Sequence, residues 1–399
     1  MAVDELAGLE RYASVAVRVG SNVRAGQNVL ISSHVAHAPL ARALARQSYA
    51  AGARYVDVQY GDPHVRRAMI ELGPDETLDY SPPWQIERVE AMAGNAMIAT
   101  TGDPEPRLLA DLDPERVGQA KPIELRKRHL EIVSASTCNW TGVAFPSEGW
   151  ANQVFGKPDV ERLWEAIGFC TRLDEDDPVA AWREHMDRLE RRGAALNALG
   201  LDRLTYRGPG TDLEIGLLER SHFGSALFRT VDGHPYVANM PTEEVFTTPD
   251  ARRAEGVVTS TKPLAVGGDV VEGLQVTFEG GRIVDVQAKH GAELIRADVG
   301  VDENAARLGE VALVDGTSRV GQSGLVYFNT LFDENATCHI AYGAAVFAGH
   351  EGTEPHEGIN VSKTHTDFMI GGPAVDVDGV TREGRVVPLL RDDVWQLPE

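Results

Sequence analysis

The order of apolar and amphipathic segments near the N-terminus constrains the fold most strongly. The apolar run QNVLIS (27–32) predicts a buried strand, and APLARALARQSYAAGA (38–53) predicts a helix with Leu40 and Leu44 on one face. RYVDVQY (54–60) predicts a second strand. A strand, a helix and a strand in this order form a βαβ unit, whose two strands pair in parallel.

Two further apolar runs extend this pattern. NAMIATT (95–101) and EIVSAS (131–136) are predicted strands, and SPPWQIERVEAMAGN (81–95) is a predicted helix before the first of them. We therefore expect an α/β N-terminal domain with a mainly parallel sheet.

The second half of the chain has a different pattern, with many Gly and Thr residues and short β-like runs. VEGLQVTFEGGRIVDVQA (271–288) alternates around two glycines and predicts a hairpin. A charged, helical stretch (159–198) separates the two halves, and 399 residues are more than one ordinary core needs. We predict an α/β N-terminal domain of residues 1–195 and a mixed α+β, β-rich C-terminal domain of residues 196–399.

The net charge of −22 argues against two classes of partner, nucleic acid and anionic membranes. No run approaches the roughly 18 apolar residues of a membrane span. The N-terminus has acidic residues early and lacks the apolar centre of a secretory signal, so we expect the cytoplasm. No G-x-G-x-x-G follows the first predicted strand, which makes a dinucleotide cofactor unexpected.

Acidic residues and histidines border apolar runs at four places in the second half. They are Glu243 and Glu244 in PTEEVF, Glu310 in LGEVALV, Glu334 and His339 in FDENATCHIAYG, and His365 and Asp367 in SKTHTDFMIGG. Carboxylates at the edge of buried strands are costly unless they are paired or bind a metal ion. Two His with several carboxylates suit Zn²⁺, Co²⁺ or Mn²⁺, and six ligands are about right for two ions.

Each of these places also has an ordinary explanation when it is taken alone. A single His beside an apolar run usually belongs to a core, Glu310 could cap a turn, and Glu243 and Glu244 could lie in an acidic loop. In a strand, His365 and Asp367 would point to the same face because the period is two. The four places together favour a metal centre in the C-terminal domain.

The chain resembles the thermophilic metallo-aminopeptidases of the aminopeptidase T type. The resemblance rests on PTEEVFTTPD, LGEVALV, FNTLFDENATCHIAYG and GINVSKTHTDFMIGG, and also on AGQNVLI, FPSEGWANQVFG and GPGTDLEIGL. It implies a cytosolic homodimer that removes N-terminal residues from short peptides. It also implies two divalent metal ions, zinc before cobalt, manganese or magnesium.

The resemblance also implies which residues act. The implied metal ligands are Glu244, Glu310, Glu334, His339, His365 and Asp367, where Glu244 is preferred to Glu243 on spacing. The implied mechanism is attack by a hydroxide that bridges the two metals, with Glu310 or Glu334 carrying the proton.

One position departs from the family pattern. The family has a Tyr seven residues after the motif His, and this chain has Val346 there. Tyr342 lies four residues earlier, and positions 342 and 346 share a face of a helix or a strand. Tyr342 is therefore the candidate for the missing phenol and the third predicted catalytic residue.

Two other functions remain open at this point. His339, His365 and Asp367 alone form a two-His-one-carboxylate set, which suits the non-haem Fe(II) of a ring-cleaving dioxygenase. The chain could also be a non-catalytic homologue that binds metal or peptide and lost turnover with the Tyr. Retention of Glu244, Glu310 and Glu334 favours hydrolysis.

Overall fold

The computed structural model describes residues 3–266, 269–346, 349 and 357–398. The chain packs as two compact units, residues 1–183 with 227–240 and residues 184–226 with 241–399. We call them unit 1 and unit 2. The second unit begins inside helix α9 (Pro178–Ala198), and a short segment returns to the first. The division into an N-terminal α/β domain of residues 1–195 and a C-terminal catalytic, metal-binding domain of residues 196–399 stays a prediction.

Unit 1 is an α/β unit built on a five-stranded sheet in the order β2-β1-β3-β4-β9, and every pair in it is parallel. Its strands are β1 (Asn28–His34), β2 (Tyr55–Gly61), β3 (Ala96–Thr101), β4 (Asn139–Ala144) and β9 (Asn239–Met240), with a separate pair β7 (Leu227–Arg229) and β8 (Pro235–Val237). The predicted βαβ unit and the mainly parallel sheet are confirmed.

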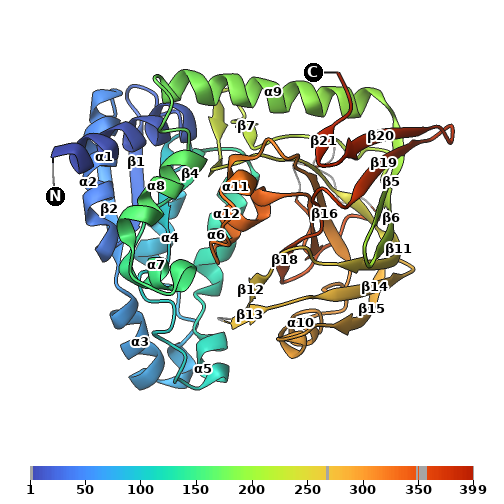
Figure 1. Ribbon diagram of the computed structural model, residues 1–399. Helices are drawn as coiled ribbons and strands as arrows, with labels where there is room; N and C mark the ends of the chain where they lie inside the picture. The colour runs from blue at the N-terminus through green and yellow to red at the C-terminus, as the bar shows by residue number, and fades with distance from the viewer. Residues whose placement is uncertain (1–2, 267–268, 347–348, 350–356, 399) are drawn as a thin grey trace. The chain divides into compact units, whose positions relative to one another are not determined.

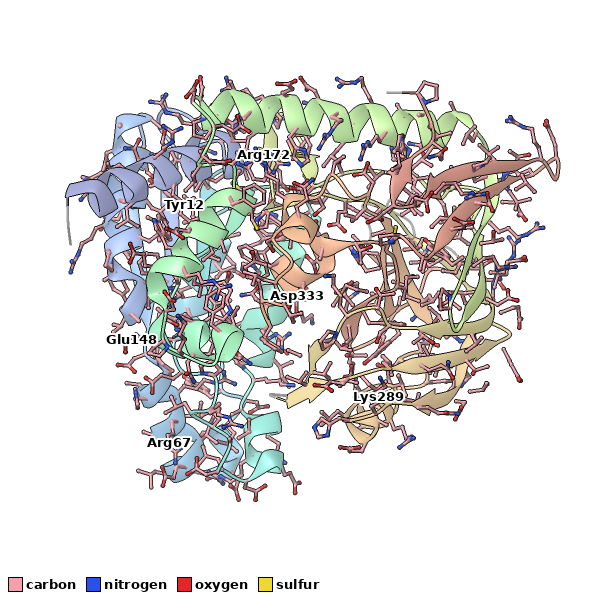
Figure 2. The ribbon with its side chains drawn as sticks, viewed as in Figure 1. Tyr12, Arg67, Glu148, Arg172, Lys289 and Asp333 are labelled. Carbon is pink, nitrogen blue, oxygen red and sulfur yellow. The ribbon has the colours of Figure 1, made fainter. Side chains whose placement is uncertain are left out.

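The helices of unit 1 surround this sheet (Figure 1). They are α1 (Val3–Val15), η1 (Ala16–Gly20), η2 (Val35–His37), α2 (Ala38–Ala50), α3 (Pro63–Leu72), η3 (Asp75–Thr77), α4 (Pro83–Glu90), α5 (Pro114–Gln119), α6 (Ile123–Ser134), α7 (Glu148–Phe155) and α8 (Val160–Cys170). Tyr12 of α1 (Figure 2) is fully buried, and its hydroxyl oxygen accepts a hydrogen bond from the backbone N–H of Ala144 at 3.0 Å. This bond joins α1 to the end of β4.

The predicted strand at 131–136 is wrong. Residues 131–134 are the last turn of α6, and the strand of this region begins later, at Asn139. Ser136 has φ +51° and turns the chain between the two. Ile132 and Val133 pack against a buried cluster that includes Leu30. A short apolar run looks the same at the end of an amphipathic helix as in a strand, so periodicity alone could not separate them.

Fully buried His37 gives unit 1 a specific pH dependence. Its Nδ1 lies 3.0 Å from Thr100 Oγ1, and its ring packs against His34 and Phe145. Burial, and then the neighbouring His34, lower its pKa to about 4. The folded protein therefore keeps His37 neutral where the unfolded chain binds a proton, between about pH 6.5 and 4.

We expect acid to destabilise unit 1 partly through this residue. The stabilising contribution is present above pH 6.5 and is lost as the pH falls through about 4, a loss of about 3 kcal/mol. Urea unfolding followed by circular dichroism at pH 7 and pH 4.5 measures it. The fall in unfolding free energy should be smaller in His37→Gln than in the wild type. Equal falls in both proteins would contradict the assignment.

Unit 2 is β-rich and holds two antiparallel sheets. The larger has the order β15-β14-β11-β6-β5-β19-β20-β21, and the smaller has the order β10-β16-β17-β18. The larger contains β5 (Leu201–Gly208), β6 (Thr211–Leu217), β11 (Pro249–Thr259), β14 (Gln275–Glu279), β15 (Arg282–Gln287), β19 (Asp376–Thr381), β20 (Val386–Arg391) and β21 (Val394–Trp395). The hairpin predicted around Gly280 and Gly281 is β14–β15.

The smaller sheet carries the candidate site. It contains β10 (Val245–Thr247), β16 (Leu308–Leu313), β17 (His339–Gly343) and β18 (His365–Met369). Around it lie the pair β12 (Leu264–Val266) and β13 (Asp269–Val271), and the helices α10 (Ala292–Asp298), α11 (Arg319–Gln322), α12 (Thr330–Asp333) and η4 (Glu334–Ala336). Every residue of β16 and β17 is buried. The prediction of a parallel α/β unit followed by a β-rich α+β unit is confirmed. Within the described residues, no helix is both long enough and apolar enough to span a membrane.

Candidate metal centre

Adjacent strands bring the predicted ligands onto one face of the smaller sheet. Asp367 of β18 lies opposite Ala341 of β17, and Glu310 of β16 lies opposite the same alanine from the other side. His339 is two residues from Ala341, and His365 is two residues from Asp367. Because paired residues and alternate residues share a face, all four side chains point the same way. The small Ala341 between Glu310 and Asp367 leaves room for both carboxylates.

A β-bulge places Glu310 on this face. Leu308 lies opposite Tyr342, but Glu310 lies opposite Ala341, so Gly309 is the extra residue of β16. Without the bulge Glu310 would point to the face of Leu308. A side chain at position 309 would not fit, since an added Cβ would lie 2.2 Å from the carbonyl oxygen of Ala344. The glycine of LGEVALV therefore determines where the carboxylate of Glu310 points.

The ligand atoms form two groups of three. Glu244, Glu310 and His339 form one group, and Glu310, His365 and Asp367 form the other, with all atoms of a group within 4.8 Å of one another. Glu310 belongs to both groups. In the first group His339 Nε2 lies 2.9 Å from Glu244 Oε2. In the second, His365 Nε2 lies 3.3 Å from Glu310 Oε2 and 3.4 Å from Asp367 Oδ2.

Both imidazoles present Nε2 to the carboxylates because Nδ1 is used elsewhere. His365 Nδ1 lies 2.7 Å from the carbonyl oxygen of Ala344, and His339 Nδ1 lies 3.3 Å from that of Thr337. A carbonyl accepts only, so Nδ1 must carry the proton. When the Nε2 proton is lost, the neutral imidazole has its lone pair on Nε2, which is the tautomer usual for histidines that bind metals.

The charges at the site are unbalanced. Burial, together with the charges of Asp367 and Glu244, raises the pKa of Glu310, and burial beside Asp367 raises that of Glu334 well above its usual value. Burial alone would lower the pKa of His339, but Glu244 raises it to about 10. In the same way Asp367 and Glu310 outweigh burial and raise the pKa of His365 to about 12. Two protonated imidazoles do not neutralise four carboxylates.

The residues fit a divalent cation. In the described part of the chain no Lys or Arg lies within ion-pair distance of Glu244, Glu310, Glu334 or Asp367; their only ion pairs are with the two histidines. Carboxylate oxygens and imidazole nitrogens are the donors that Zn²⁺, Mn²⁺ and Co²⁺ accept. The side chain of His365 is 33% exposed and that of His339 only 1%, so the second group lies on the more open side.

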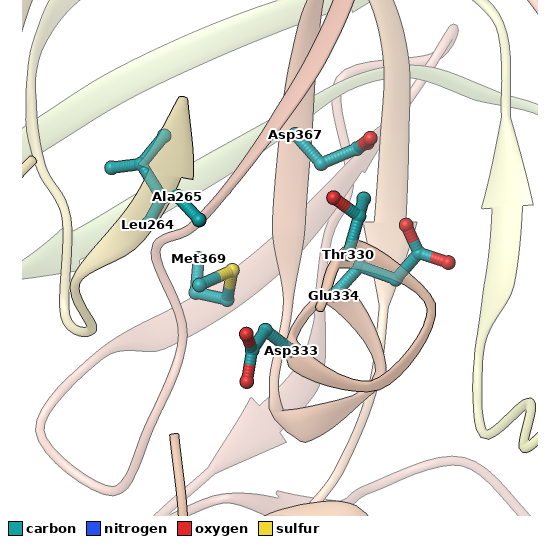
Figure 3. Close-up of a pocket in the computed structure, with 7 residues that line it drawn as sticks. All are labelled: Leu264, Ala265, Thr330, Asp333, Glu334, Asp367 and Met369. Atoms are coloured by element: carbon teal, nitrogen blue, oxygen red, sulfur yellow. The ribbon is translucent and has the colours of Figure 1, made fainter. Parts of the chain in front are cut away.

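Glu334 lies beside the two groups and belongs to neither. It begins η4 and lines a small pocket together with Asp367 (Figure 3). Its carboxylate and that of Asp367 extend to the same side of the view in Figure 3. Among the described residues its carboxylate accepts one hydrogen bond, a long one of 3.5 Å from the side-chain amide of Asn335. Glu334 thus lies beside the centre, and its carboxylate is little engaged by the protein.

The structure does not bring Tyr342 to the centre. In β17 it lies between Ala341 and Gly343, so its side chain points to the opposite face of the sheet from His339. Its hydroxyl donates a hydrogen bond to Asp298 Oδ2 at 2.8 Å. The strand ends at Gly343, so positions 342 and 346 do not lie on one face of a common strand. The expectation that Tyr342 replaces the missing phenol is not supported by this placement.

Sequence analysis also missed residues that surround the centre. His185 of α9 is buried, and its Nε2 lies 2.8 Å from the carbonyl oxygen of Thr242 and 3.4 Å from Glu243 Oε2. The side-chain oxygen of Asn335 accepts the backbone N–H of Glu243 at 2.7 Å. These contacts fix the segment before Glu244. A His within a charged helix and an Asn beside an acid gave no signal of this role.

Comparison with known proteins identifies the family. Residues 6–395 match the model of the thermophilic metalloprotease family (M29). The chain is 42% identical to aminopeptidase T of Thermus thermophilus over 97% of its own length and 98% of that protein. It is 38% identical to aminopeptidase AmpS of Bacillus subtilis, also over 97% and 98%. The solved structure of wild-type AmpT from Thermus thermophilus superposes with a TM-score of 0.92 at 41% identity, covering 98% of this chain and 99% of that one. The chain therefore belongs to the M29 family of thermophilic metalloproteases and is a hydrolase.

Proposed function

We propose that this chain is an aminopeptidase that removes N-terminal residues from short peptides with the help of two divalent metal ions. The observation that carries the proposal is the position of Glu310, which is shared by the two groups of three ligand atoms. A carboxylate with two oxygens can bridge a pair of ions. The relatives at 42% and 38% identity are named aminopeptidases, which supports the same activity here.

The residues of the centre would have different roles. Glu244, Glu310 and His339 would hold one ion, and Glu310, His365 and Asp367 the other, with Glu334 at the same centre. When bound, such ions polarise a carbonyl and lower the pKa of a bound water toward neutrality. Zinc is the ion that we expect first, with cobalt, manganese or magnesium as alternatives.

Glu334 and Glu310 are the candidates for moving the proton. Both are buried beside other acids, which raises their pKa values in the metal-free protein. A carboxyl group of this kind can take a proton from the attacking water and pass it to the leaving amine. A site carboxylate would also pair with the free α-amino group of the peptide. Because Glu334 lies outside both ligand groups, we assign it one of these two tasks.

The dioxygenase alternative has less support from the geometry. It needs His339, His365 and Asp367 around one iron, but His339 groups with Glu244 and Glu310, while His365 and Asp367 group with each other through Glu310. Within the described residues these three do not form a group of their own. A non-catalytic metal or peptide binder remains the second alternative, and a test of turnover decides it.

The experiment is a comparison of peptides by N-terminus. Metal-stripped protein is supplied with Zn²⁺, Co²⁺, Mn²⁺ or Fe²⁺ and given a panel of di- and tripeptides, each free and N-acetylated. We expect a metal-dependent release of the first residue from the free peptides only. Equal cleavage of the acetylated peptides would point to another kind of peptidase. Oxygen uptake with Fe²⁺ and a hydroxypyridine, without peptide cleavage, would support the dioxygenase.

We also propose a homodimer in the cytoplasm, as the resemblance implies. Large apolar side chains are exposed on α3 and α4 of unit 1, including Val65, Leu72 and Trp84, and such exposure is usual where another chain binds. Light scattering during gel filtration should give twice the mass of 43.2 kDa. A mass of one chain at micromolar concentration would contradict the dimer.

The pocket beside Glu334 and Asp367 is where we propose that the first side chain of the peptide lies. It is lined by residues of β12, α12, η4 and β18: Leu264, Ala265, Thr330, Asp333, Glu334, Asp367 and Met369 (Figure 3). The carboxylate of Asp333 is already hydrogen-bonded within the protein, since it accepts the backbone N–H groups of Tyr327 and Asn329 at 2.7 and 2.9 Å. The pocket leaves ≈ 20 Å³ for the centre of a water-sized sphere. That is room for about one water molecule or a methyl group, so we expect N-terminal Ala to be preferred to Leu.

Changing the size of this pocket should change the preference. Met369→Ala removes a side chain from its wall, and Ala265→Val adds bulk to its wall. We expect the ratio of kcat/KM for Leu-peptides to that for Ala-peptides to rise about tenfold in the first variant and to fall in the second. The ratio does not depend on the fraction of folded enzyme. An unchanged ratio in both variants would show that the side chain binds elsewhere.

A further inference from the structure

We propose that Asp298 is a positioning residue that holds the strand with His365 and Asp367 in place from behind. The inference rests on the proposed metal centre and adds to it a part that lies on the other face of the sheet. Asp298 is the last residue of α10. Three hydroxyl groups donate to its carboxylate, those of Tyr342 and Thr366 to Oδ2 at 2.8 and 2.7 Å and that of Thr364 to Oδ1 at 2.8 Å.

We call Asp298 with its three hydroxyl partners the anchor. β18 needs such an anchor because of its place in the sheet. In the described chain β18 is an edge strand of five residues that pairs only with β17. Among the described residues, the one backbone hydrogen bond on its free edge is at its end, where the carbonyl oxygen of Met369 accepts the N–H of Thr261 at 2.8 Å. The beginning of the strand, with His365, has no such bond. Ends of edge strands open most readily, so His365 depends on side-chain contacts.

The pattern of the strand divides these contacts between its two faces. His365 and Asp367 point to the metal centre, and Thr364 and Thr366 point to the other face. The two threonine hydroxyls flank the backbone of His365 and bind both oxygens of one carboxylate. A displacement of His365 toward solvent would therefore break charge-assisted hydrogen bonds on the far side.

The anchor itself is attached to a rigid part of unit 2. Ile295 of α10 is fully buried, and Arg296 donates a hydrogen bond to the carbonyl oxygen of Val286 in β15 at 2.6 Å. The adjacent segment adds a second attachment, because Asp302 accepts the hydroxyl of Ser362 at 2.9 Å and the backbone N–H of Lys363 at 2.7 Å. Two carboxylates thus hold the chain before β18, and that of Asp298 belongs to a helix that is bonded to the larger sheet.

Tyr342 takes its role from this arrangement. Its fully buried phenol lies on β17 and supplies the third hydroxyl, so it links the neighbouring strand to the same carboxylate. Burial and the charge of Asp298 raise its pKa, which keeps the phenol protonated as a donor. Tyr342 therefore acts on the position of the ligands, from the opposite face of the sheet.

The arrangement predicts an unequal effect on the two ions. Glu244 and His339 are outside β18, whereas two ligands of the other group, His365 and Asp367, are on it. Loss of the anchor should lower the affinity for the ion at Glu310, His365 and Asp367 about tenfold or more, as is usual when a residue that orients metal ligands is removed. The other ion should stay bound. A general loss of stability would lower the affinity for both ions alike.

The test uses Asp298→Ala and the nearly isosteric Thr366→Val, with Thr211→Val as the control. Thr211 is a buried strand threonine of β6 in the larger sheet, and its hydroxyl accepts the backbone N–H of Thr259 at 3.1 Å. Each protein is loaded with Zn²⁺ and dialysed against a graded chelator, and its metal content is measured. We expect two ions per chain in the wild type and in the control at a chelator concentration where Asp298→Ala and Thr366→Val retain one.

Hydrogen exchange of the metal-free proteins provides the readout that does not depend on metal or activity. The amides of residues 364–368 should exchange at least tenfold faster in both variants than in the wild type and the control. Faster exchange of these amides in the two variants, with no metal binding in any of the proteins, would contradict the proposed function and support the anchor. Unchanged exchange, or equal loss of both ions, would overturn the anchor and leave the proposed function standing.

Discussion

Glu310→Gln is expected to lower kcat for the release of N-terminal residues about 10³-fold and to leave the protein unable to hold two ions. Glu310 is the one residue common to both ligand groups, and it is buried with 6% of its surface exposed. An amide has one acceptor oxygen and no charge, so it would hold two cations much more weakly than the carboxylate would. The measurement is steady-state cleavage of an Ala-peptide together with the metal content of the same sample.

The control for this variant is an acid on the surface of the same unit. Glu279 is exposed in β14, and Glu279→Gln should keep wild-type kcat and both ions. If Glu310→Gln kept more than a tenth of the wild-type kcat with two ions bound, Glu310 would be neither bridge nor proton carrier. Glu334→Gln would then be the next variant, because its pKa is raised for the same reasons.

Removal of the metal ions is the change with the second largest expected effect. A ligand at 1,000 times its dissociation constant stabilises the folded state by about 4 kcal/mol. For a unit of this size that corresponds to a fall in melting temperature of roughly 10 °C when the ions are removed. Calorimetry with and without chelator measures it, and identical melting curves would contradict ion binding by the folded centre.

The metal-free protein should also become less stable toward alkaline pH. His339 and His365 have pKa values raised to about 10 and about 12, so in the folded metal-free state they are charged and paired with carboxylates. This contribution is complete below pH 6.5, declines as the unfolded chain alone loses the protons, and is gone once the pH has risen through the folded values. The chelator effect should therefore be larger at pH 9 than at pH 6.

Proton release gives the same conclusion an independent check. An imidazole must lose its proton to bind a metal ion, so binding of two ions at pH 7.5 should release about two protons from the histidines. Titration calorimetry in buffers of different ionisation enthalpy counts them. A count near zero would mean that His339 and His365 are neutral in the metal-free protein or do not bind the ions.

The parts of the fold that depend on local pattern were predictable from the sequence. The βαβ unit at 27–60 has apolar runs and an amphipathic helix of clear period, and the hairpin at Gly280 has strand alternation on both sides of a turn. The prediction of a strand at residues 131–136 was wrong because the apolar Ile132 and Val133 lie in the last turn of a helix. Their short run contains too few residues to show a period.

The candidate centre was predictable where spacing alone fixes geometry. His365 and Asp367 are two apart in a strand, so their shared face followed from the sequence. The direction of Glu310 did not follow, because it depends on the bulge at Gly309, which reverses the face that simple alternation predicts. The placement of Tyr342 away from the centre could not be predicted for a related reason, since a strand that ends at Gly343 carries no alternation on to position 346.

Contacts between distant segments were out of reach of the sequence. Nothing in the composition of α10 indicates that Asp298 meets hydroxyl groups of residues 342, 364 and 366. His185 likewise meets the segment of Glu243 only through tertiary packing. Such partners are set by how sheets and helices pack, and one sequence by itself does not encode them in a readable pattern.

The most direct test of the central claim is a titration of metal-free protein with Zn²⁺ in which bound ions per chain and release of the first residue from an Ala-dipeptide are followed together. The account predicts that two ions bind and that release appears with the second one, since the two groups share Glu310. Two bound ions without release, with Zn²⁺ or with Co²⁺ or Mn²⁺ in its place, would contradict the account.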